Sequence, residues 1–499
     1  MKDLIEKALL AQCRKSVDAA NLACYVRQKK RQEYQKVTGI AAKTVSGRMA
    51  IWDLGNQFNP YFVKRHADTY SRRLEKVITA NSYEPQPCLN IEIPKDSGKK
   101  RTISQYTVVD AALSCWVYES LLKKNLAKLS KFAFAFRRDL NSTDAVEMIA
   151  KRIRGKARTF CVEIDFKNCF DAIDHKYLMQ VLDFNFNISP QERHMITAFL
   201  KGRYARGKEH YEKGTFKPRH SGIPQGSTVS LFLANAVFYE LDKALENLNV
   251  TFARYADDIL VLSDTYDAAN SAAQFIADFS SKSGIPINFG KSGGISLISP
   301  ISGEIKTKPH FDFLGYQISA NEVRLSSRRK HTIKKTISEI INRRLLLHPR
   351  KGDLNKKRFY GGTDWDLVVC VNELRRRIYG RSLTEEDVIG EIKHGTASPR
   401  SLVSAHPLVN TNKDYVELDG WLQGCLRRAL IQRAALVKKL KVKGIVTPDR
   451  RILTTGTWYK NKEISQDTRL PSLTRAWSYA RRLLEKRGSK AFESGYEGY

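Results

Sequence analysis

Helix-like and strand-like patterns of apolar residues follow one another along the chain. Apolar residues recur every three or four positions in residues 2–40 and 110–130 and again from Asp144, which predicts a helix in each segment. The longer apolar run of residues 228–241 is also predicted to be helical. In residues 159–165, TFCVEID, apolar residues alternate with others, as in a strand that ends in a carboxylate.

Two segments are predicted to form β-hairpins. Ile91–Ile103 has two short strands around an Asp-Ser-Gly turn, and its second strand is basic. Residues 251–263 give two strands around Ala-Asp-Asp, which places acids at the hairpin tip.

Two further helices are predicted from capping and charge. Asp174 is in position to cap a helix over HKYLMQVL. Residues 421–451, with nine Lys or Arg and one acid, predict a basic helix. Its apolar side contains Leu422, Leu426, Leu430 and Ile431.

The charge balance favours a polyanionic partner. The chain has 85 Lys and Arg against 52 Asp and Glu, a net charge of +33, together with 21 Tyr, 22 Phe and 6 Trp. A basic surface with many aromatic side chains is typical of nucleic-acid binding, although a merely soluble basic protein is the alternative. Residues 321–499 carry 38 Lys and Arg against 19 Asp and Glu, so the C-terminal third is the more basic.

Length and cysteine spacing narrow the class of protein further. A chain of 499 residues is long enough for roughly two to four packed units. Its 8 cysteines are scattered, without the close pairs that structural zinc sites use, so reduced thiols are expected. No run of about 18 uncharged apolar residues occurs, so we expect a cytoplasmic protein without a membrane partner.

The acids at the ends of the predicted strands indicate a metal-dependent reaction. Nucleotidyl transfer uses two divalent ions roughly 4 Å apart, one at the attacking hydroxyl and one at the triphosphate. Carboxylate oxygens are suitable ligands for such ions. Asp165 ends one predicted strand, and Asp257 and Asp258 lie at a hairpin tip, so adjacent strands would bring them to one sheet edge. An Asp-Asp pair at a turn is common, and alone it would be weak support.

The joint pattern of five motifs resembles the palm of reverse transcriptases. These motifs are EIDFKNCFDAIDH (163–175), SGIPQGSTVSLFLAN (221–235), YADD (255–258), FGK (289–291) and FLGY (313–316). Their order and spacing also match, and IPKDSGKKR and FAFRR are similar to fingers motifs of group II intron, retron and related bacterial enzymes. The resemblance covers residues 85–320.

The resemblance implies a site for two Mg²⁺ ions, with Mn²⁺ as an alternative, held by Asp165, Asp257 and Asp258. Lys291 would act as the general acid that protonates the departing pyrophosphate. The residues that would bind the nucleotide are Lys95, Lys100, Arg101, Phe170, Gln225 and Gly226. Among them, Phe170 would lie under the sugar and exclude a 2′-hydroxyl, which would select dNTPs. A core Phe, a helix-entry turn at Gln225 and solvated surface lysines are the structural alternatives.

FLGY resembles the primer grip, which implies that Phe313, Gly315 and Tyr316 support the primer. The final residues, ESGYEGY, suggest a second hypothesis. Tyr496 and Tyr499 could present a phenol hydroxyl in place of a primer 3′-hydroxyl, as in protein-primed relatives. A tail without a role is the alternative.

Beyond residue 320 the resemblance thins. Residues 417–434 are similar to the thumb and maturase region of group II intron proteins, but no Cys/His endonuclease cluster or clear ribonuclease H set of acids follows. A Val-Thr-Gly signature like that of retron enzymes is also missing after FLGY. The chain therefore most resembles the bacterial "unknown group" reverse transcriptases, many of which act in antiphage defence, an inference by analogy.

We therefore predict an α/β plus α fold, a right-hand polymerase with fingers, palm and thumb and a helical basic C-terminal extension. The predicted boundaries are 1–84 for an N-terminal helical region, 85–158 with 176–220 for the fingers, 159–320 for the palm, 321–400 for the thumb and 401–499 for the C-terminal domain. The expected activity is RNA-directed DNA polymerisation on a structured non-coding RNA, with dNTPs as substrates and DNA as product. The chain is compatible with a monomer or a homo-oligomer. The alternatives are an RNA-dependent RNA polymerase, a group II intron-type maturase and a non-catalytic RNA-binding protein.

Overall fold

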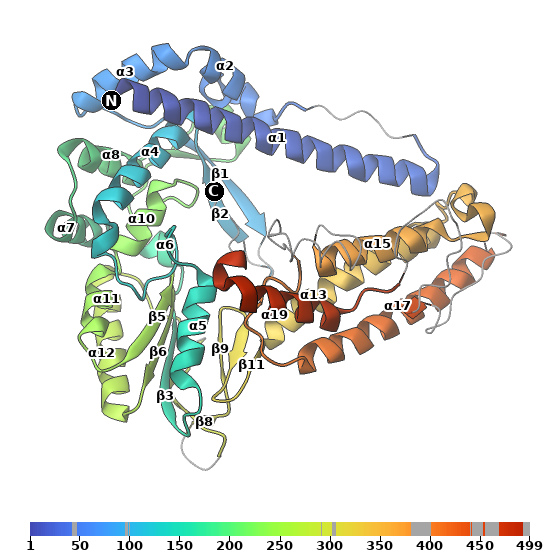
Figure 1. The fold of residues 1–499 in the computed structure, drawn as a ribbon. Helices are drawn as coiled ribbons and strands as arrows, with labels where there is room; N and C mark the ends of the chain where they lie inside the picture. Colours follow the sequence, from blue (N-terminus) through green and yellow to red (C-terminus); the bar gives the residue numbers. More distant parts are fainter. Residues whose placement is uncertain are drawn as a thin grey trace.

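A five-stranded sheet in the order β5-β6-β3-β7-β8 forms the palm (Figure 1). Its strands are β3 (Thr159–Asp165), β5 (Thr251–Tyr255), β6 (Asp258–Ser263), β7 (Gly294–Ile298) and β8 (Thr307–Lys308). β3 is antiparallel to both of its neighbours, β6 and β7. The strand predicted to end at Asp165 and the hairpin predicted for residues 251–263 are both confirmed.

The structure is a computed structural model. It describes residues 1–41, 47–94, 98, 100–290, 292–301, 306–380, 401–439, 441, 453–454 and 469–492.

The two faces of the palm sheet pack into different cores, because side chains alternate along each strand. One core contains Val162 and Ile164 of β3 with Ile276 from a helix of the palm. The helices that contribute buried residues to this core include α6 (Cys169–Ala172), α7 (His175–Asn185), α8 (Pro190–Leu200), α10 (Val229–Ala236), α11 (Tyr239–Glu246) and α12 (Tyr266–Ser283). On the other face, Cys161 and Leu260 join a second core with α5 (Ser142–Ile153) and the thumb.

Two local predictions for the palm helices have different outcomes. Asp174 caps α7 as predicted, since its Oδ1 accepts a hydrogen bond from the Tyr177 amide at 2.8 Å. The single helix predicted over residues 228–241 is wrong, because the chain forms α10 and α11 with a turn between them. At that turn the Phe238 amide bonds the Asn235 carbonyl, three residues back, instead of continuing the regular helical ladder.

The fingers contain a three-stranded sheet in the order β2-β1-β4. β1 (Cys88–Pro94) and β2 (Lys100–Gln105) form the predicted antiparallel hairpin with Ile91 opposite Ile103, and β4 (Tyr204–Arg206) pairs with β1 in parallel. The adjoining helices are α4 (Val108–Asn125), η3 (Leu126–Lys128) and α9 (Lys208–Glu212).

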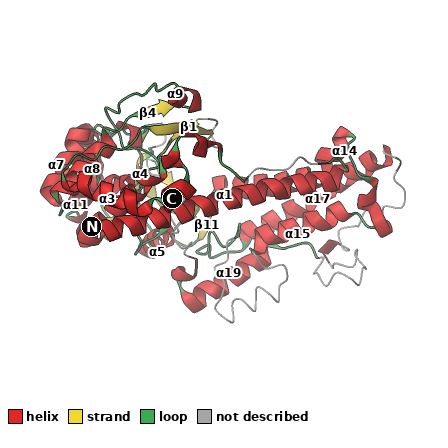
Figure 2. Cartoon of the chain, turned by 90° about the horizontal axis from the view of Figure 1, so that it is seen from above, coloured by secondary structure: helices red, strands yellow, loops and turns green. Residues whose placement is uncertain are grey.

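The predicted N-terminal helix is confirmed as α1 (Lys2–Thr38). Its first half buries Ile5, Leu9 and Cys13 against α3 (Ala67–Thr79) and α4. Figures 1 and 2 show its second half extending from the fingers to the thumb helices. The remaining elements of this region are η1 (Ala50–Leu54), η2 (Asn56–Phe58), α2 (Pro60–Arg65) and α3 (Ala67–Thr79).

A small antiparallel sheet, β9 (Phe311–Phe313), β10 (Tyr316–Ile318) and β11 (Val323–Leu325), precedes the thumb helices. The helices that follow are α13 (Ser327–Ile341), the π-helical turn η4 (Asn342–Leu346), α14 (Leu347–Lys351), η5 (Lys356–Gly362), α15 (Trp365–Tyr379), α17 (Lys413–Lys439), α19 (Leu473–Arg487) and η6 (Ser489–Phe492). The predicted basic helix is confirmed over residues 421–439, which lie in α17, with Leu422, Leu426 and Leu430 buried. The placement of Ile431 on its apolar side is wrong, since that side chain is 59% exposed. Residues 440 and 442–451 of the predicted helix lie outside the described residues.

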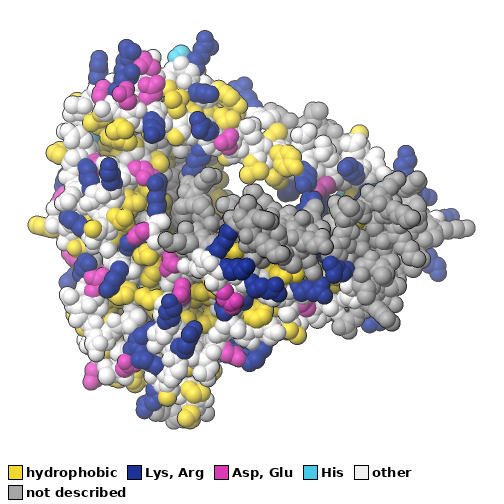
Figure 3. Space-filling model, in the orientation of Figure 1, with side chains coloured by type: hydrophobic (Ala, Val, Ile, Leu, Met, Phe, Trp, Pro, Cys, Tyr) yellow, Lys and Arg dark blue, Asp and Glu magenta, His cyan; other side chains and the backbone are white. Residues whose placement is uncertain are grey.

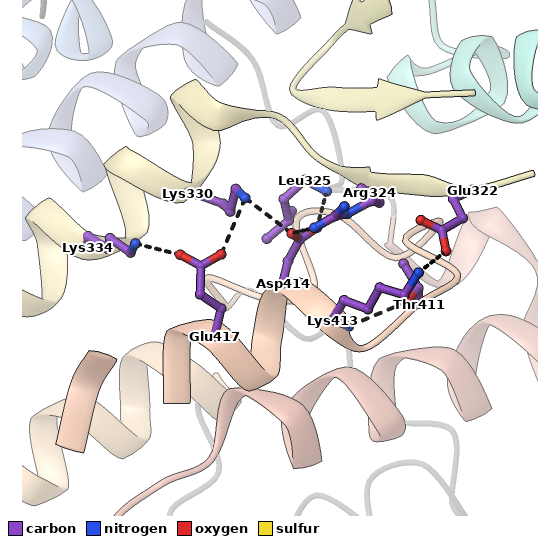
Figure 4. Close-up of polar contacts among 9 residues, drawn as sticks. All are labelled: Glu322, Arg324, Leu325, Lys330, Lys334, Thr411, Lys413, Asp414 and Glu417. Atoms are coloured by element: carbon purple, nitrogen blue, oxygen red, sulfur yellow. Dashed lines mark hydrogen bonds and ion pairs between the residues drawn. The ribbon is translucent and has the colours of Figure 1, made fainter. Parts of the chain in front are cut away.

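Charged contacts attach α17 to β11 and α13 (Figure 4). The buried Asp414 carboxylate accepts hydrogen bonds from Arg324 Nη2 at 2.6 Å and the Leu325 amide at 3.0 Å, and it also pairs with Lys330. Glu417, one turn later, accepts a bond from Lys334 Nζ at 2.8 Å. These contacts join segments that lie more than 80 residues apart in sequence.

Candidate active site

Two of the predicted metal ligands lie opposite each other in the palm sheet. Asp165 is the last residue of β3, Asp258 is the first of β6, and the two are paired in register. Residues paired in this way carry their side chains on the same face of a sheet. Asp257 lies beside Asp258 in the turn after β5, next to Ala256, whose φ is +58°. The three acids predicted to form the site are therefore brought to one sheet edge.

Two residues that the sequence analysis did not identify hold Asp165 in place. Asn288 Nδ2 donates to Asp165 Oδ2 at 2.7 Å, and the Asn288 amide donates to the Asp165 carbonyl at 2.8 Å. The Asp165 amide donates to Ser292 Oγ at 3.2 Å. Both partners flank the FGK motif, and this proximity is the only signal in the sequence that could have identified them.

The chemistry of the three acids fits Mg²⁺. Among the residues that the structure describes, no group of three or more Asp, Glu, His or Cys side chains is already gathered as a metal cluster. Mg²⁺ is commonly held by one or two carboxylates together with substrate phosphates and water, rather than by a complete protein cage. Asp165 and Asp258, which are paired in register, with Asp257 adjacent, match this open kind of site.

Phe170 lies at the start of the short helix α6, five residues after Asp165. Its ring meets the ring of Phe136 edge to face, with 6.2 Å between centroids. The Phe170 carbonyl accepts a 2.7 Å hydrogen bond from the Ile223 amide. At Gly222, with φ +74°, a Cβ would lie 2.6 Å from that carbonyl, so the glycine permits a close approach of two segments. The ring of Phe170 is therefore held by Phe136, and its backbone is held by Ile223.

Arg101 and Gln225, both predicted to bind the nucleotide, are in contact. Arg101 Nε donates to Gln225 Oε1 at 2.6 Å, and the Ser104 amide donates to the Gln225 carbonyl at 2.6 Å. Gly226 has φ +122°, and a Cβ there would lie 2.3 Å from the Ser104 carbonyl oxygen. The close approach observed at Gly226 is therefore to strand β2. The hairpin of the fingers and the Pro-Gln-Gly turn form one unit.

Of the other predicted cations, the structure describes Lys100. Lys100 pairs with Glu92 across the hairpin at 2.5 Å, and hydrogen bonding to this carboxylate raises the pKa of the exposed Lys100. Lys95 and Lys291 lie outside the described residues. The same is true of Tyr496 and Tyr499, the residues of the protein-priming hypothesis.

The predicted primer grip is a tight hairpin between β9 and β10. Phe313 and Tyr316 are both buried, so the turn residues Leu314 and Gly315 are the more accessible part of this hairpin. Gly315 has φ +87°, and a Cβ there would lie 2.7 Å from His406 Nε2. Arg329 Nε donates to His406 Nε2 at 2.8 Å, and burial lowers the pKa of His406 to about 3.

Basic side chains gather on one face of the thumb side of the molecule. Figure 3 shows Lys and Arg gathered in a band over the C-terminal helices. In α19, the exposed basic residues are Arg475, Arg482, Lys486 and Arg487. A positive surface of this kind attracts the phosphates of a nucleic acid.

Residues 93–318 match the family described as "Reverse transcriptase (RNA-dependent DNA polymerase)". The chain contains a reverse transcriptase domain. This domain includes the three acids, Phe170, the Arg101–Gln225 contact and the β9–β10 hairpin.

Relatives of the reverse transcriptase domain include group II intron proteins and a retron enzyme. The chain is 32% identical over 193 residues to "Group II intron-encoded protein LtrA" of Lactococcus lactis subsp. cremoris, a match to 38% of this chain and 31% of that protein. It is 29% identical to "Putative COX1/OXI3 intron 2 protein" of Saccharomyces cerevisiae, covering 36% of this chain and 20% of that protein. It is 25% identical to "Retron Ec73 reverse transcriptase" of Escherichia coli, covering 37% and 56%. The match thus spans less than a third of LtrA.

Two solved telomerase structures also show similarity. The apo telomerase of Candida tropicalis, truncated from the C-terminal domain, has 15% identity and a TM-score of 0.37, with 52% of this chain and 60% of that chain covered. Telomerase from Candida albicans in complex with a TWJ fragment of telomeric RNA has 12% identity and a TM-score of 0.39, with 77% and 69% covered.

Within the described ranges, no helix combines the length and the apolar character needed to span a membrane.

Proposed function

We propose that this chain is an RNA-directed DNA polymerase that extends a primer 3′-end with dNTPs along an RNA template. The observation that carries the proposal is the in-register pairing of Asp165 with Asp258, with Asp257 in the adjacent turn, inside a reverse transcriptase domain. Nucleotidyl transfer needs carboxylates that converge near bound nucleic acid, and the paired acids and the exposed cations of the C-terminal helices support this proposal.

In this proposal Asp165, Asp257 and Asp258 hold two Mg²⁺ ions. When bound, these ions lower the pKa of the attacking hydroxyl and neutralise charge on the triphosphate. Asn288 and Ser292 orient Asp165, so the carboxylate needs little rearrangement when substrate arrives. Arg101 can offer its guanidinium to phosphate oxygens, while Gln225 fixes the direction of its side chain.

The test is incorporation of labelled dNTPs on a primed RNA template in Mg²⁺. We expect Asp257→Ala to reduce the rate by about a hundredfold or more, since the ions contribute several kcal/mol at the transition state. Asp278→Ala, in an exposed residue of α12, is the matched control and should keep the wild-type rate. A wild-type chain that is inactive on its co-purified RNA and on added primed templates would contradict the proposal and favour the non-catalytic RNA-binding role.

Sugar selection separates a DNA polymerase from an RNA polymerase. We expect Phe170→Ala to narrow the preference for dNTPs over NTPs by roughly 10- to 200-fold, because the ring would no longer exclude a 2′-hydroxyl. The comparison uses kcat/KM for one dNTP and its matching NTP on the same template. If Phe170 is only a core residue, Phe170→Ala lowers stability but leaves the ratio unchanged.

The biological role that we propose is antiphage defence with a partner non-coding RNA as template. It is supported by a reverse transcriptase domain joined to basic helices, α17 and α19, in the C-terminal part of the chain. Phage plating should fall on cells with the intact gene and recover with Asp257→Ala, while Asp278→Ala keeps protection. Equal plating of a broad phage panel on all three strains would remove this role without affecting the polymerase activity.

A further inference from the structure

Arg254 is a fully buried cation directly before the acidic turn. It lies in β5, with 0% of its surface exposed, three residues before Asp257. Its guanidinium makes a bidentate contact with Asp242 of α11, with Nε to Oδ1 at 2.8 Å and Nη2 to Oδ2 at 2.5 Å. The guanidinium also lies 4.8 Å from the centre of the Phe238 ring. Arg254 is therefore fixed by two kinds of contact, an ion pair and a cation–π contact.

The remaining nitrogen of Arg254 reaches the acidic turn itself. Nη1 donates to the carbonyl oxygen of Ala256 at 3.2 Å and to Asn235 Oδ1, also at 3.2 Å. Ala256 has φ +58°, a left-handed conformation that costs a residue with a Cβ roughly 1–2 kcal/mol. A hydrogen bond to its carbonyl stabilises this conformation and sets the direction in which the chain enters Asp257.

The same side chain connects the turn to the surrounding palm. Asn235 of α10, which accepts from Arg254, donates through Nδ2 to the Ala135 carbonyl at 2.9 Å. The Arg254 amide donates to the Phe132 carbonyl, and the Arg254 carbonyl accepts from the Phe134 amide, each at 2.9 Å. Arg254 thus fixes the turn relative to both α10 and residues 132–135.

The charges of Arg254 and Asp257 have opposite effects on the pKa of the buried Cys169 thiol. Burial raises the pKa of the Cys169 thiol; the negative charge of Asp257 adds to the increase, and the positive charge of Arg254 opposes it. Removal of Arg254 would leave Asp242 as a buried carboxylate without its arginine partner.

We propose that Arg254 is a positioning residue of the polymerase. By bonding the Ala256 carbonyl and neutralising Asp242, it holds Asp257 and Asp258 in the arrangement that binds divalent cations. The role of Arg254 in polymerisation rests on the proposed function. The prediction for Arg254 concerns metal affinity, which is measurable without nucleotide addition.

The central variant is the double substitution Arg254→Met with Asp242→Leu. It removes the bond to Ala256 and leaves no unpaired charge, and replacing a buried ion pair with apolar residues is often neutral for stability. We expect the Mn²⁺ dissociation constant, measured from the free-ion EPR signal, to rise about 10- to 100-fold, the range found when partners of metal ligands are lost. The Mn²⁺ concentration for half-maximal dNTP incorporation should rise with it, while RNA affinity stays at the wild-type value.

Arg433 provides a matched control in the thumb. It is a buried arginine that binds Asp364 and Asp366, donates to the Leu345 carbonyl and lies over the Phe359 ring. Arg433→Met with Asp364→Asn should lower the melting temperature but leave Mn²⁺ affinity unchanged. This control separates a general effect of losing a buried arginine from an effect on the acidic turn.

A second variant covers failure of the double variant to fold. Arg254→Lys keeps the charge but cannot bond Asp242 and Ala256 through one planar fork, so an intermediate rise in the Mn²⁺ dissociation constant is expected. Wild-type Mn²⁺ affinity in either folded variant would overturn the proposal, and so would a wild-type chain without Asp257-dependent Mn²⁺ binding. Asp257-dependent binding that weakens in the Arg254 variants, in a chain that incorporates no dNTP, would uphold the proposal and refute the proposed polymerase function alone.

Discussion

At the scale of single residues, Gly222 tests whether Phe170 must be held in place. We expect Gly222→Ala to lower kcat/KM for dNTPs by roughly tenfold and to destabilise the fold by about 1–3 kcal/mol, because a Cβ would lie 2.6 Å from the Phe170 carbonyl. Gly214 has a similar φ of +68° with nothing within 4 Å of its Cβ position. Gly214→Ala therefore reproduces the backbone strain without the collision. Equal dNTP kinetics in the two variants would show that the collision is relieved without moving Phe170.

His406 gives the thumb a defined dependence on pH. Burial, together with the nearby charge of Arg329, lowers the pKa of His406 to about 3 from an unfolded value near 6.5. The unfolded chain therefore binds the proton more readily, so stability from this group is present above about pH 6.5 and falls as the pH drops toward 3, by about 1.4 kcal/mol per unit. Urea unfolding of wild type and His406→Phe between pH 7 and 5 measures this contribution. Parallel pH profiles for the two proteins would contradict the assignment.

At the scale of secondary-structure elements, Asp414 anchors α17 to β11 and α13. Its carboxylate is buried and receives bonds from Arg324, Lys330 and the Leu325 amide (Figure 4). Asp414→Ala would leave the Leu325 amide without this acceptor, so we expect a loss of about 3–5 kcal/mol in the free energy of unfolding. Glu417→Ala removes a half-exposed carboxylate from the same helix and should cost at most about 1 kcal/mol. Similar melting temperatures for the two variants would show that Asp414 does not anchor the helix.

The sequence predicted those elements whose patterns are local. Strand β3 and the hairpin around Asp257 appear as expected, because alternation and turn residues depend on near neighbours. The contacts of Asn288 and Arg254 could not be predicted in the same way. Asn288 meets Asp165 across 123 residues, and Arg254 lies in a strand whose pattern gives no sign that an arginine is buried there. Contacts of this kind depend on how the elements pack, which periodicity does not specify.

At the scale of the whole molecule, α1 connects the fingers to the thumb. Its first half packs against α3 and α4, while Glu33 pairs with Arg343 and Arg344 and Tyr34 meets His348 edge to face. We expect Glu33→Ala to increase hydrogen exchange in residues 22–38 and to leave residues 2–20 protected, because only the second half depends on the thumb. Glu6→Ala, which removes a pair with Lys2 in the first half, is the control. Unchanged exchange in residues 22–38 would mean that the ion pairs do not hold this end.

The net charge of +33 leads to a prediction about RNA binding by the whole chain. Binding that neutralises phosphates releases counterions, so the logarithm of the association constant should fall linearly with the logarithm of salt concentration. Replacing the four exposed basic residues of α19 with Gln should reduce that slope by at most about 3, since each contact with a single strand contributes about 0.7. The measurement is fluorescence anisotropy of one labelled RNA across a salt series, with the exposed Lys29 and Lys30 of α1 replaced for comparison. A slope that falls only in the α19 variant would locate phosphate contacts on the C-terminal helices. A slope that falls equally in both would mean that the RNA responds to the overall field of the protein, and the C-terminal part of the chain would then not be a specific RNA-binding surface.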